Sequence, residues 1–117
     1  MATVTDQELI TRTVYDYFEG WYDGDVTRMG RALHPDLVKR SPAEFDLAIL
    51  TKDRMLELTA QGEGTKEADD RRLDVRIGDV CDDIASVIVR SAPYREYVHL
   101  VRTPDGWKIT NALYVPR

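Results

Sequence analysis

The sequence predicts one α+β domain in which helices precede a single antiparallel sheet. Residues 1–61 carry three helix-cap patterns, each followed by apolar residues at helical spacing. The residues from 71 onward divide into four strand-length runs separated by turns. A length of 117 residues suits one hydrophobic core. We therefore expect residues 1–117 to form a single domain, with the helices on one face of a curved sheet.

The composition excludes several classes of protein. Hydrophobic residues make up 43% of the chain and charged residues 32%, as in ordinary globular domains. A net charge of -5 argues against a nucleic-acid-binding surface, and no apolar run is long enough to cross a bilayer. The lone Cys81 has no partner for an internal disulfide, and the N-terminus does not resemble a secretory leader. We expect a cytoplasmic protein without nucleic-acid or membrane partners.

Three polar caps predict where the helices begin. Thr5 and Glu8 form a capping box in "TDQE", and the following helix ends at "DGD". Asp25 caps a short second helix through "VTRMGRAL", which ends before "HPD" because proline disfavours helical geometry in the preceding residue. Thr51 caps a third helix, "KDRMLELTAQ", with Met55 on its buried side. The apolar face of the first helix consists of Ile10, Val14, Tyr17, Phe18 and Trp21.

The remaining segments are predicted as strands and loops. "DLVKRS" is typical of a short strand, "SPAEFDLAILT" of loop and irregular strand, and "EGTKEADD" of a polar loop. The "TPDG" turn joins the last two strand runs and is the clearest turn signal in the chain. Successive hairpins predict an antiparallel meander of "RRLDVRIGDV", "DIASVIVRSA", "YREYVHLVRT" and "GWKITNALYV".

Three stretches resemble the superfamily of nuclear transport factor two, ketosteroid isomerase and SnoaL-like proteins. They are "YFEGWYDGDVTRMGRALHPD", "IASVIVR" and "YVHLVRTPDGWKITNALY". The "HP" after the second helix and the terminal "GWKI" hairpin are most similar to the branch labelled putative lumazine-binding. The resemblance spans nearly the whole chain and implies a cystatin-like α+β roll. In that roll a cone-shaped sheet wraps the first helix and leads to a pocket at its open end.

Alternation along the strands suggests which residues line the pocket. Trp107 and Ile109 are the larger apolar pair of the last strand, so we place their face inward, together with Asn111. A buried Asn111 needs either a ligand or a polar neighbour. Arg90 can face inward from "DIASVIVRSA". Lys39 and Arg40 are consecutive on a strand, so one of them faces inward, where a cation suits a carboxylate or phenolate ligand. Alternatively, both side chains are solvated and have no ligand.

His34 lies in the connection that rims the pocket in this superfamily. It can serve as a general acid or base, helped by Tyr22 and Asn111. Alternatively, it caps the C-terminal end of the second helix, while Pro35 and Asp36 make the turn. The candidate catalytic residues are His34, Tyr22 and Asn111. The candidate ligand-binding residues are Tyr17, Lys39, Met55, Arg90 and Trp107.

Ketosteroid isomerase combines a tyrosine and a protonated carboxylic acid in an oxyanion hole with an aspartate base. In the phasing above no Asp or Glu lies on the inner faces of the last two strands, so we do not expect that carboxylate pair. His34 and His99 are the two histidines, and His99 lacks an acidic neighbour at ligand spacing; no glycine-rich phosphate loop precedes a helix. We therefore expect neither a metal nor an organic cofactor.

The outer sheet face is expected to be apolar and aromatic. The resemblance implies that it pairs with a second copy, giving a homodimer. The function is either a cofactor-independent lyase, isomerase or cyclase acting on an apolar or aromatic ligand, or a noncatalytic ligand-binding or accessory domain. The expected outer residues are Tyr97, His99, Val101, Thr110, Ala112 and Tyr114.

Overall fold

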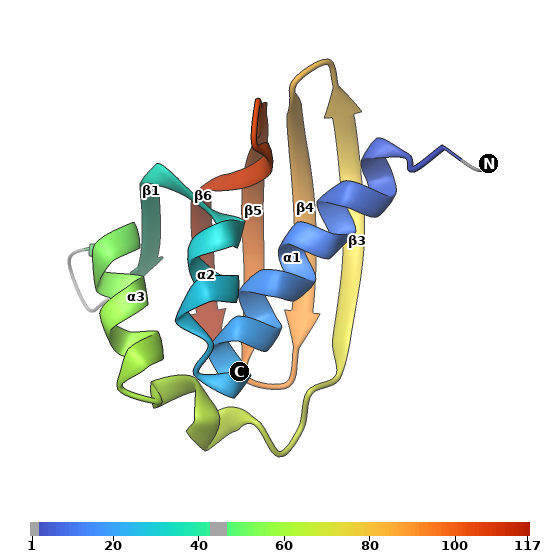
Figure 1. The fold of residues 1–117 in the computed structure, drawn as a ribbon. Helices are drawn as coiled ribbons and strands as arrows, with labels where there is room; N and C mark the ends of the chain where they lie inside the picture. Colours follow the sequence, from blue (N-terminus) through green and yellow to red (C-terminus); the bar gives the residue numbers. More distant parts are fainter. Residues whose placement is uncertain (1–2, 43–46) are drawn as a thin grey trace.

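The computed structural model describes residues 3–42 and 47–117, and it has the predicted α+β architecture. The helices all lie on one face of a curved sheet, and α1 runs diagonally across it (Figure 1). In chain order the elements are α1 (Asp6–Asp23), α2 (Val26–Ala32), β1 (Leu33–Pro42), β2 (Leu47–Thr51), α3 (Lys52–Ala60), the 3-10 helix η1 (Glu63–Glu67), β3 (Leu73–Cys81), β4 (Ile84–Ser91), β5 (Tyr94–Thr103) and β6 (Gly106–Pro116).

The six strands are ordered β2-β1-β6-β5-β4-β3. The meander from β3 to β6 is antiparallel, as predicted, whereas β1 pairs with β6 in parallel. The stretch expected as loop and irregular strand contributes β2, which pairs with β1; its residues 43–46, including Phe45, lie outside the described residues. The segment expected as a polar loop folds into η1.

The three predicted caps form as expected. The side chain of Thr5 accepts a hydrogen bond from the Glu8 backbone N–H at 3.2 Å, and those of Asp25 and Thr51 accept equivalent bonds in α2 and α3. Gly24 ends α1 with φ 65°, the left-handed conformation that glycine adopts without a Cβ clash. No helix in the described part of the chain combines the length and hydropathy needed to span a bilayer.

The core lies between α1 and the inner sheet face. Alternation on β4 and β5 turns Val87, Val89, Val98 and Leu100 toward the helix, where all four are buried. From α1, the side chains of Ile10, Val14, Tyr17 and Phe18 are buried against them.

A β-bulge in β6 overturns the predicted phasing of the last strand. His99 pairs with Asn111 and Leu100 with Ile109, so Thr110 is an extra residue in β6. Before the bulge Ile109 is buried, as predicted; after it Ala112 is buried and Leu113 is exposed. The prediction that Asn111 faces inward was therefore wrong, as was the outward placement of Ala112 and Tyr114.

Candidate functional site

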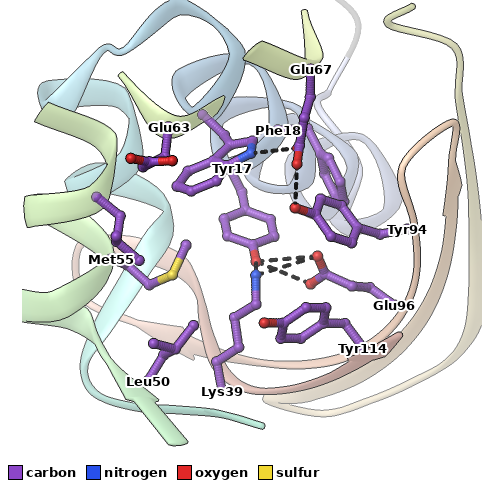
Figure 2. Close-up of a pocket in the computed structure, with 12 residues that line it drawn as sticks. Tyr17, Phe18, Lys39, Leu50, Met55, Glu63, Glu67, Tyr94, Glu96 and Tyr114 are labelled. Carbon is purple, nitrogen blue, oxygen red and sulfur yellow. Dashed lines mark hydrogen bonds and ion pairs between the residues drawn. The ribbon is translucent and has the colours of Figure 1, made fainter. Parts of the chain in front are cut away.

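A cavity of about 220 Å³ lies between the second half of α1, α3, η1 and the inner sheet face (Figure 2). Its lining combines rings, aliphatic groups and charges. The aromatic lining residues are Tyr17, Phe18, Trp21, Tyr94 and Tyr114, and the aliphatic ones are Leu50, Met55 and Leu58. The charged lining residues are Lys39, Glu63, Glu67 and Glu96.

Lys39, Tyr17 and Glu96 meet at the wall of the cavity, and we call them the inner trio. The Tyr17 hydroxyl donates to the Glu96 carboxylate, with oxygen distances of 3.0 and 3.3 Å. The Lys39 ammonium donates to the Tyr17 hydroxyl and lies 3.5 Å from a Glu96 oxygen. The side chains of Lys39 and Glu96 are 8% and 1% exposed, so an ion pair is buried here. Leu50 and Met55 face the trio from the opposite side (Figure 2).

Local structure explains why these three side chains converge. Tyr17 belongs to the buried face of α1. Lys39 follows Leu37 on the inner face of β1, and both are buried. Glu96 shares the inner face of β5 with Val98, two residues further on. One helix and two strands of the sheet therefore position the inner trio, and none of it depends on a loop.

Tyrosine rings surround the Lys39 ammonium. Its nitrogen lies 4.3 Å from the centroid of the Tyr114 ring, 5.0 Å from that of Tyr17 and 5.9 Å from that of Tyr94. Tyr94 and Tyr114 contact each other edge to face at 5.5 Å. Cation–π attraction from these rings, together with Glu96, offsets part of the cost of burying the ammonium.

The inner trio keeps the Tyr17 hydroxyl protonated. Burial raises the pKa of Tyr17 well above its usual value of 10.0, and the negative charge of Glu96 raises it further. At neutral pH this hydroxyl is therefore a hydrogen-bond donor. The trio combines a cation, a neutral donor and a carboxylate acceptor at one wall of an aromatic cavity.

A second carboxylate, that of Glu67 on η1, links two of the lining rings. One Glu67 oxygen accepts from the Trp21 indole N–H at 3.0 Å, and the other accepts from the Tyr94 hydroxyl at 2.6 Å. Burial and this bond to Glu67 raise the pKa of Tyr94. Gly64 lets η1 pack closely on α1, because a Cβ at this position would lie 2.1 Å from the Trp21 carbonyl oxygen.

The structure brings together three of the predicted site residues, Tyr17, Lys39 and Met55, which all line the cavity. Asn111 lies on the outer face, 3.4 Å from a ring nitrogen of His99 and 3.4 Å from Arg40. It faces outward because the bulge at Thr110 reverses the side-chain alternation. Its predicted inward orientation is thus corrected.

The remaining predicted residues lie away from the cavity. Arg90 is exposed on β4, where its neighbour Val89 takes the inner position, so its inward orientation was wrong. Trp107 is inward and buried, but its indole N–H points to Asp6 at the start of α1. Tyr22 is buried beside the Arg71 guanidinium and does not line the cavity.

His34 is the second residue of β1, so the prediction that Pro35 and Asp36 make a turn was wrong. Its Nδ1 accepts the Asp36 backbone N–H at 3.0 Å, and the side chain is 27% exposed. It lines a separate, more open hollow of about 610 Å³, not the cavity of the inner trio. At the end of α2 the Arg31 carbonyl accepts instead from the Lys108 ammonium at 2.6 Å, and the next-but-one carbonyl, that of Leu33, accepts from Lys52 at 3.0 Å.

Sequence reasoning missed Glu96, and the signal was available. Any alternation that places Tyr97 and His99 outside places Glu96 inside. The prediction that no carboxylate faces inward from the last two strands was therefore wrong. Tyr114, the cross-strand partner of Glu96, was missed because the bulge reverses its side. Glu67 was missed because its segment was predicted to be a loop.

The donor set of the cavity does not suit a metal ion. Within residues 3–42 and 47–117, no three His, Cys, Asp or Glu side chains are grouped to hold one. Glu96 is paired with Lys39, and the oxygens of Glu67 accept from Trp21 and Tyr94. Aromatic rings with a few fixed polar groups suit an organic molecule better.

Solved structures share this fold at low sequence identity. A protein from Silicibacter pomeroyi described as like nuclear transport factor two superposes with a TM-score of 0.75 at 18% identity, covering 97% of this chain and 100% of its own. A ketosteroid isomerase-like protein from Erwinia carotovora atroseptica superposes with a TM-score of 0.70 at 17% identity, covering 97% of this chain and 98% of its own. A protein from Streptomyces avermitilis described as a "putative dehydratase" superposes with a TM-score of 0.59 at 18% identity, covering 96% of each chain.

Sequence comparison gives the family. No curated protein matches the chain. The family model described as "Putative lumazine-binding" matches residues 5–115, which include every helix and nearly all of the sheet. The chain therefore belongs to the family described as "Putative lumazine-binding", and it shares the fold of solved proteins described as like nuclear transport factor two and ketosteroid isomerase.

Proposed function

We propose that the cavity binds a small, largely apolar or aromatic molecule and that the inner trio transfers a proton on it without a cofactor, as a lyase, isomerase or cyclase does. One observation carries the proposal: a buried ammonium, phenol and carboxylate meet at the wall of a cavity. Such a set supplies both an acid and a base to a molecule held against it.

The roles follow from the charges. The Lys39 ammonium is a donor suited to a carbonyl oxygen on which negative charge develops. The Tyr17 hydroxyl donates its one proton to Glu96 and so orients that carboxylate. The Glu96 carboxylate is the acceptor for the proton of an adjacent C–H bond. The electron pair of that bond moves into an enolate whose oxygen Lys39 stabilises. Return of the proton to another carbon completes an isomerisation, and loss of a β-leaving group completes an elimination.

The cavity limits the size of the ligand. A volume of about 220 Å³ lies below the roughly 300–1,000 Å³ typical of sites for drug-sized ligands. Five aromatic and three aliphatic side chains in the lining favour a compact ring or short chain. The neighbours described as ketosteroid isomerase-like and as a "putative dehydratase" support a reaction of the proton-transfer class.

Hydrogen–deuterium exchange tests the proposal without knowledge of the natural substrate. Small cyclic enones such as 2-cyclohexen-1-one are incubated with the protein in D2O, and loss of their acidic C–H signals is followed by NMR. Wild type should accelerate exchange, and Glu96→Gln should lower the rate by about 100-fold or more. His34→Gln, altered outside the cavity, is the control and should match wild type. A bound enone with no accelerated exchange contradicts proton transfer.

A noncatalytic binding domain is the second candidate, and the mutual pairing of the inner trio favours it. Lys39, Tyr17 and Glu96 already satisfy one another, as a purely structural cluster would. In that case enones or aromatic fragments bind, and Lys39→Met weakens binding, yet exchange stays at the buffer rate. Binding and exchange measured on the same samples separate the two functions.

We also propose a homodimer through the outer face of the sheet. The side chains of Ile84, Ile88, Tyr97 and Leu113 are exposed there, on the three adjacent strands β4, β5 and β6. An apolar patch of this kind favours association with a second copy. Light scattering at micromolar concentration should give twice the monomer mass of 13.4 kDa, and Tyr97→Asp should return it to the monomer value. A monomer for wild type contradicts the dimer.

A further inference from the structure

The charges around the cavity are unevenly neutralised. Glu96 is paired with Lys39, and Glu63 is paired with Lys66 at 2.9 Å. Glu67 accepts only from the neutral Trp21 and Tyr94 side chains, and among the described residues it forms no ion pair. The lining therefore carries one carboxylate charge that no cation of the described chain balances.

We propose that the ligand of this cavity carries an ammonium group, which Glu67 and the neighbouring rings receive. The inference rests on the proposed function, because it concerns the same cavity and names the class of molecule that the cavity takes. That class is a small amine with an aromatic or apolar body, and an oxygen able to meet Lys39 can lie on the same molecule.

The Glu67 carboxylate has capacity for such a group. Each of its oxygens offers about two lone-pair sites, and the bonds from Trp21 and Tyr94 use one site on each. These two bonds also fix the carboxylate at the cavity wall, so little conformational freedom remains to be lost on binding. A cation here gains a charge-assisted hydrogen bond without displacing either ring.

The rings around Glu67 suit a cation as well as an apolar body. Aromatic faces attract ammonium groups within about 6 Å of the ring centroid. Three tyrosine rings of this cavity already surround the Lys39 ammonium in this way, the closest at 4.3 Å. Trp21 and Tyr94 donate hydrogen bonds to Glu67, and Phe18 lines the same cavity, so aromatic surface is also present beside this carboxylate. Carboxylate and rings together favour an amine over a neutral or anionic ligand.

A pair of matched probes tests the proposal. 2-Phenylethylamine and 2-phenylethanol have nearly the same shape and differ in charge at neutral pH. Their dissociation constants are measured by NMR titration. In wild type the amine should bind about tenfold more tightly than the alcohol. In Glu67→Gln this preference should fall to about twofold or less, while the affinity for the alcohol stays within about twofold of wild type.

Two controls keep the result interpretable. Glu63→Gln removes a carboxylate that is already paired, so the amine preference should persist. Raising NaCl from 20 to 500 mM should lower the affinity for the amine but not for the alcohol, and this measurement needs no variant. Equal binding of the two probes in wild type, or an unchanged preference in Glu67→Gln, overturns the inference and leaves ligand binding intact. Binding of neither probe overturns the cavity as a ligand site.

Discussion

Replacing Lys39 by methionine should be costly, although methionine fills a similar volume. The change leaves the Glu96 carboxylate, 1% exposed, without its cation. Removing one partner of a buried ion pair typically costs about 3–5 kcal/mol, because an uncompensated charge remains. Glu96 keeps its hydrogen bond from Tyr17, so we expect the lower end of that range, about 3 kcal/mol.

A double-mutant cycle isolates the interaction. Glu96→Gln alone should cost about 2 kcal/mol, since it leaves the Lys39 ammonium unpaired but keeps an acceptor for Tyr17. The combined variant removes both charges and should be more stable than the sum of the single effects predicts. We expect a coupling energy of about 2 kcal/mol, from urea unfolding followed by tryptophan fluorescence and circular dichroism.

Lys66→Met is the matched control. The Lys66–Glu63 pair has a nitrogen–oxygen distance of 2.9 Å, shorter than the 3.5 Å of Lys39–Glu96, but its side chains are 70% and 40% exposed. If the nitrogen–oxygen distance determined the loss of stability, Lys66→Met would cost more than Lys39→Met. Because burial of the charges determines it, Lys66→Met should cost less than about 0.5 kcal/mol. Equal losses for the two methionine variants, or additivity in the cycle, would refute the reasoning.

Three further predictions concern pH and packing. Because burial and Glu96 raise the folded-state pKa of Tyr17 above the unfolded value, its contribution to stability is present below about pH 10 and lost above it; Tyr17→Phe should flatten the alkaline decline in urea midpoint. Burial raises the pKa of Asp16, but two α2 arginines lower it more, so Asp16→Asn should cost about 0.5–1 kcal/mol at pH 7 and progressively less as the pH falls below 3.8, compared in urea. Gly64→Ala should force η1 from α1 and lower the thermal midpoint, whereas Gly30→Ala, whose Cβ meets Leu56 at 3.6 Å, should be tolerated.

Local signals in the sequence were enough to predict the helices and the meander. Thr5, Asp25 and Thr51 cap helices because a side-chain oxygen needs only its own backbone neighbours. The alternation of side chains along β5 likewise predicts that Glu96 faces inward, because its neighbour Tyr97 faces outward. That part of the site could have been predicted from the sequence.

The other part of the site depends on contacts between distant segments. The bulge at Thr110 arises where β6 pairs with both β5 and β1, and no local pattern in "GWKITNALYV" marks it. It brings Tyr114 to the Lys39 ammonium and turns Asn111 outward. Glu67 reaches Trp21 and Tyr94 across 46 and 27 residues of chain, so its role becomes visible only when η1 packs on α1.

The position of the buried charges bears on why the chain retains them. Among the described residues, Lys39 and Glu96 are the two charged side chains in the buried set, whereas the rest of the layer between α1 and the sheet is mainly apolar. Replacing a buried ion pair by well-packed apolar residues is often neutral or stabilising, so stability alone does not favour such a pair. This pair lies at the wall of a cavity and not within the packed apolar layer. A charged pair placed where a ligand can reach it, at some cost in stability, is the arrangement expected of groups that act on that ligand.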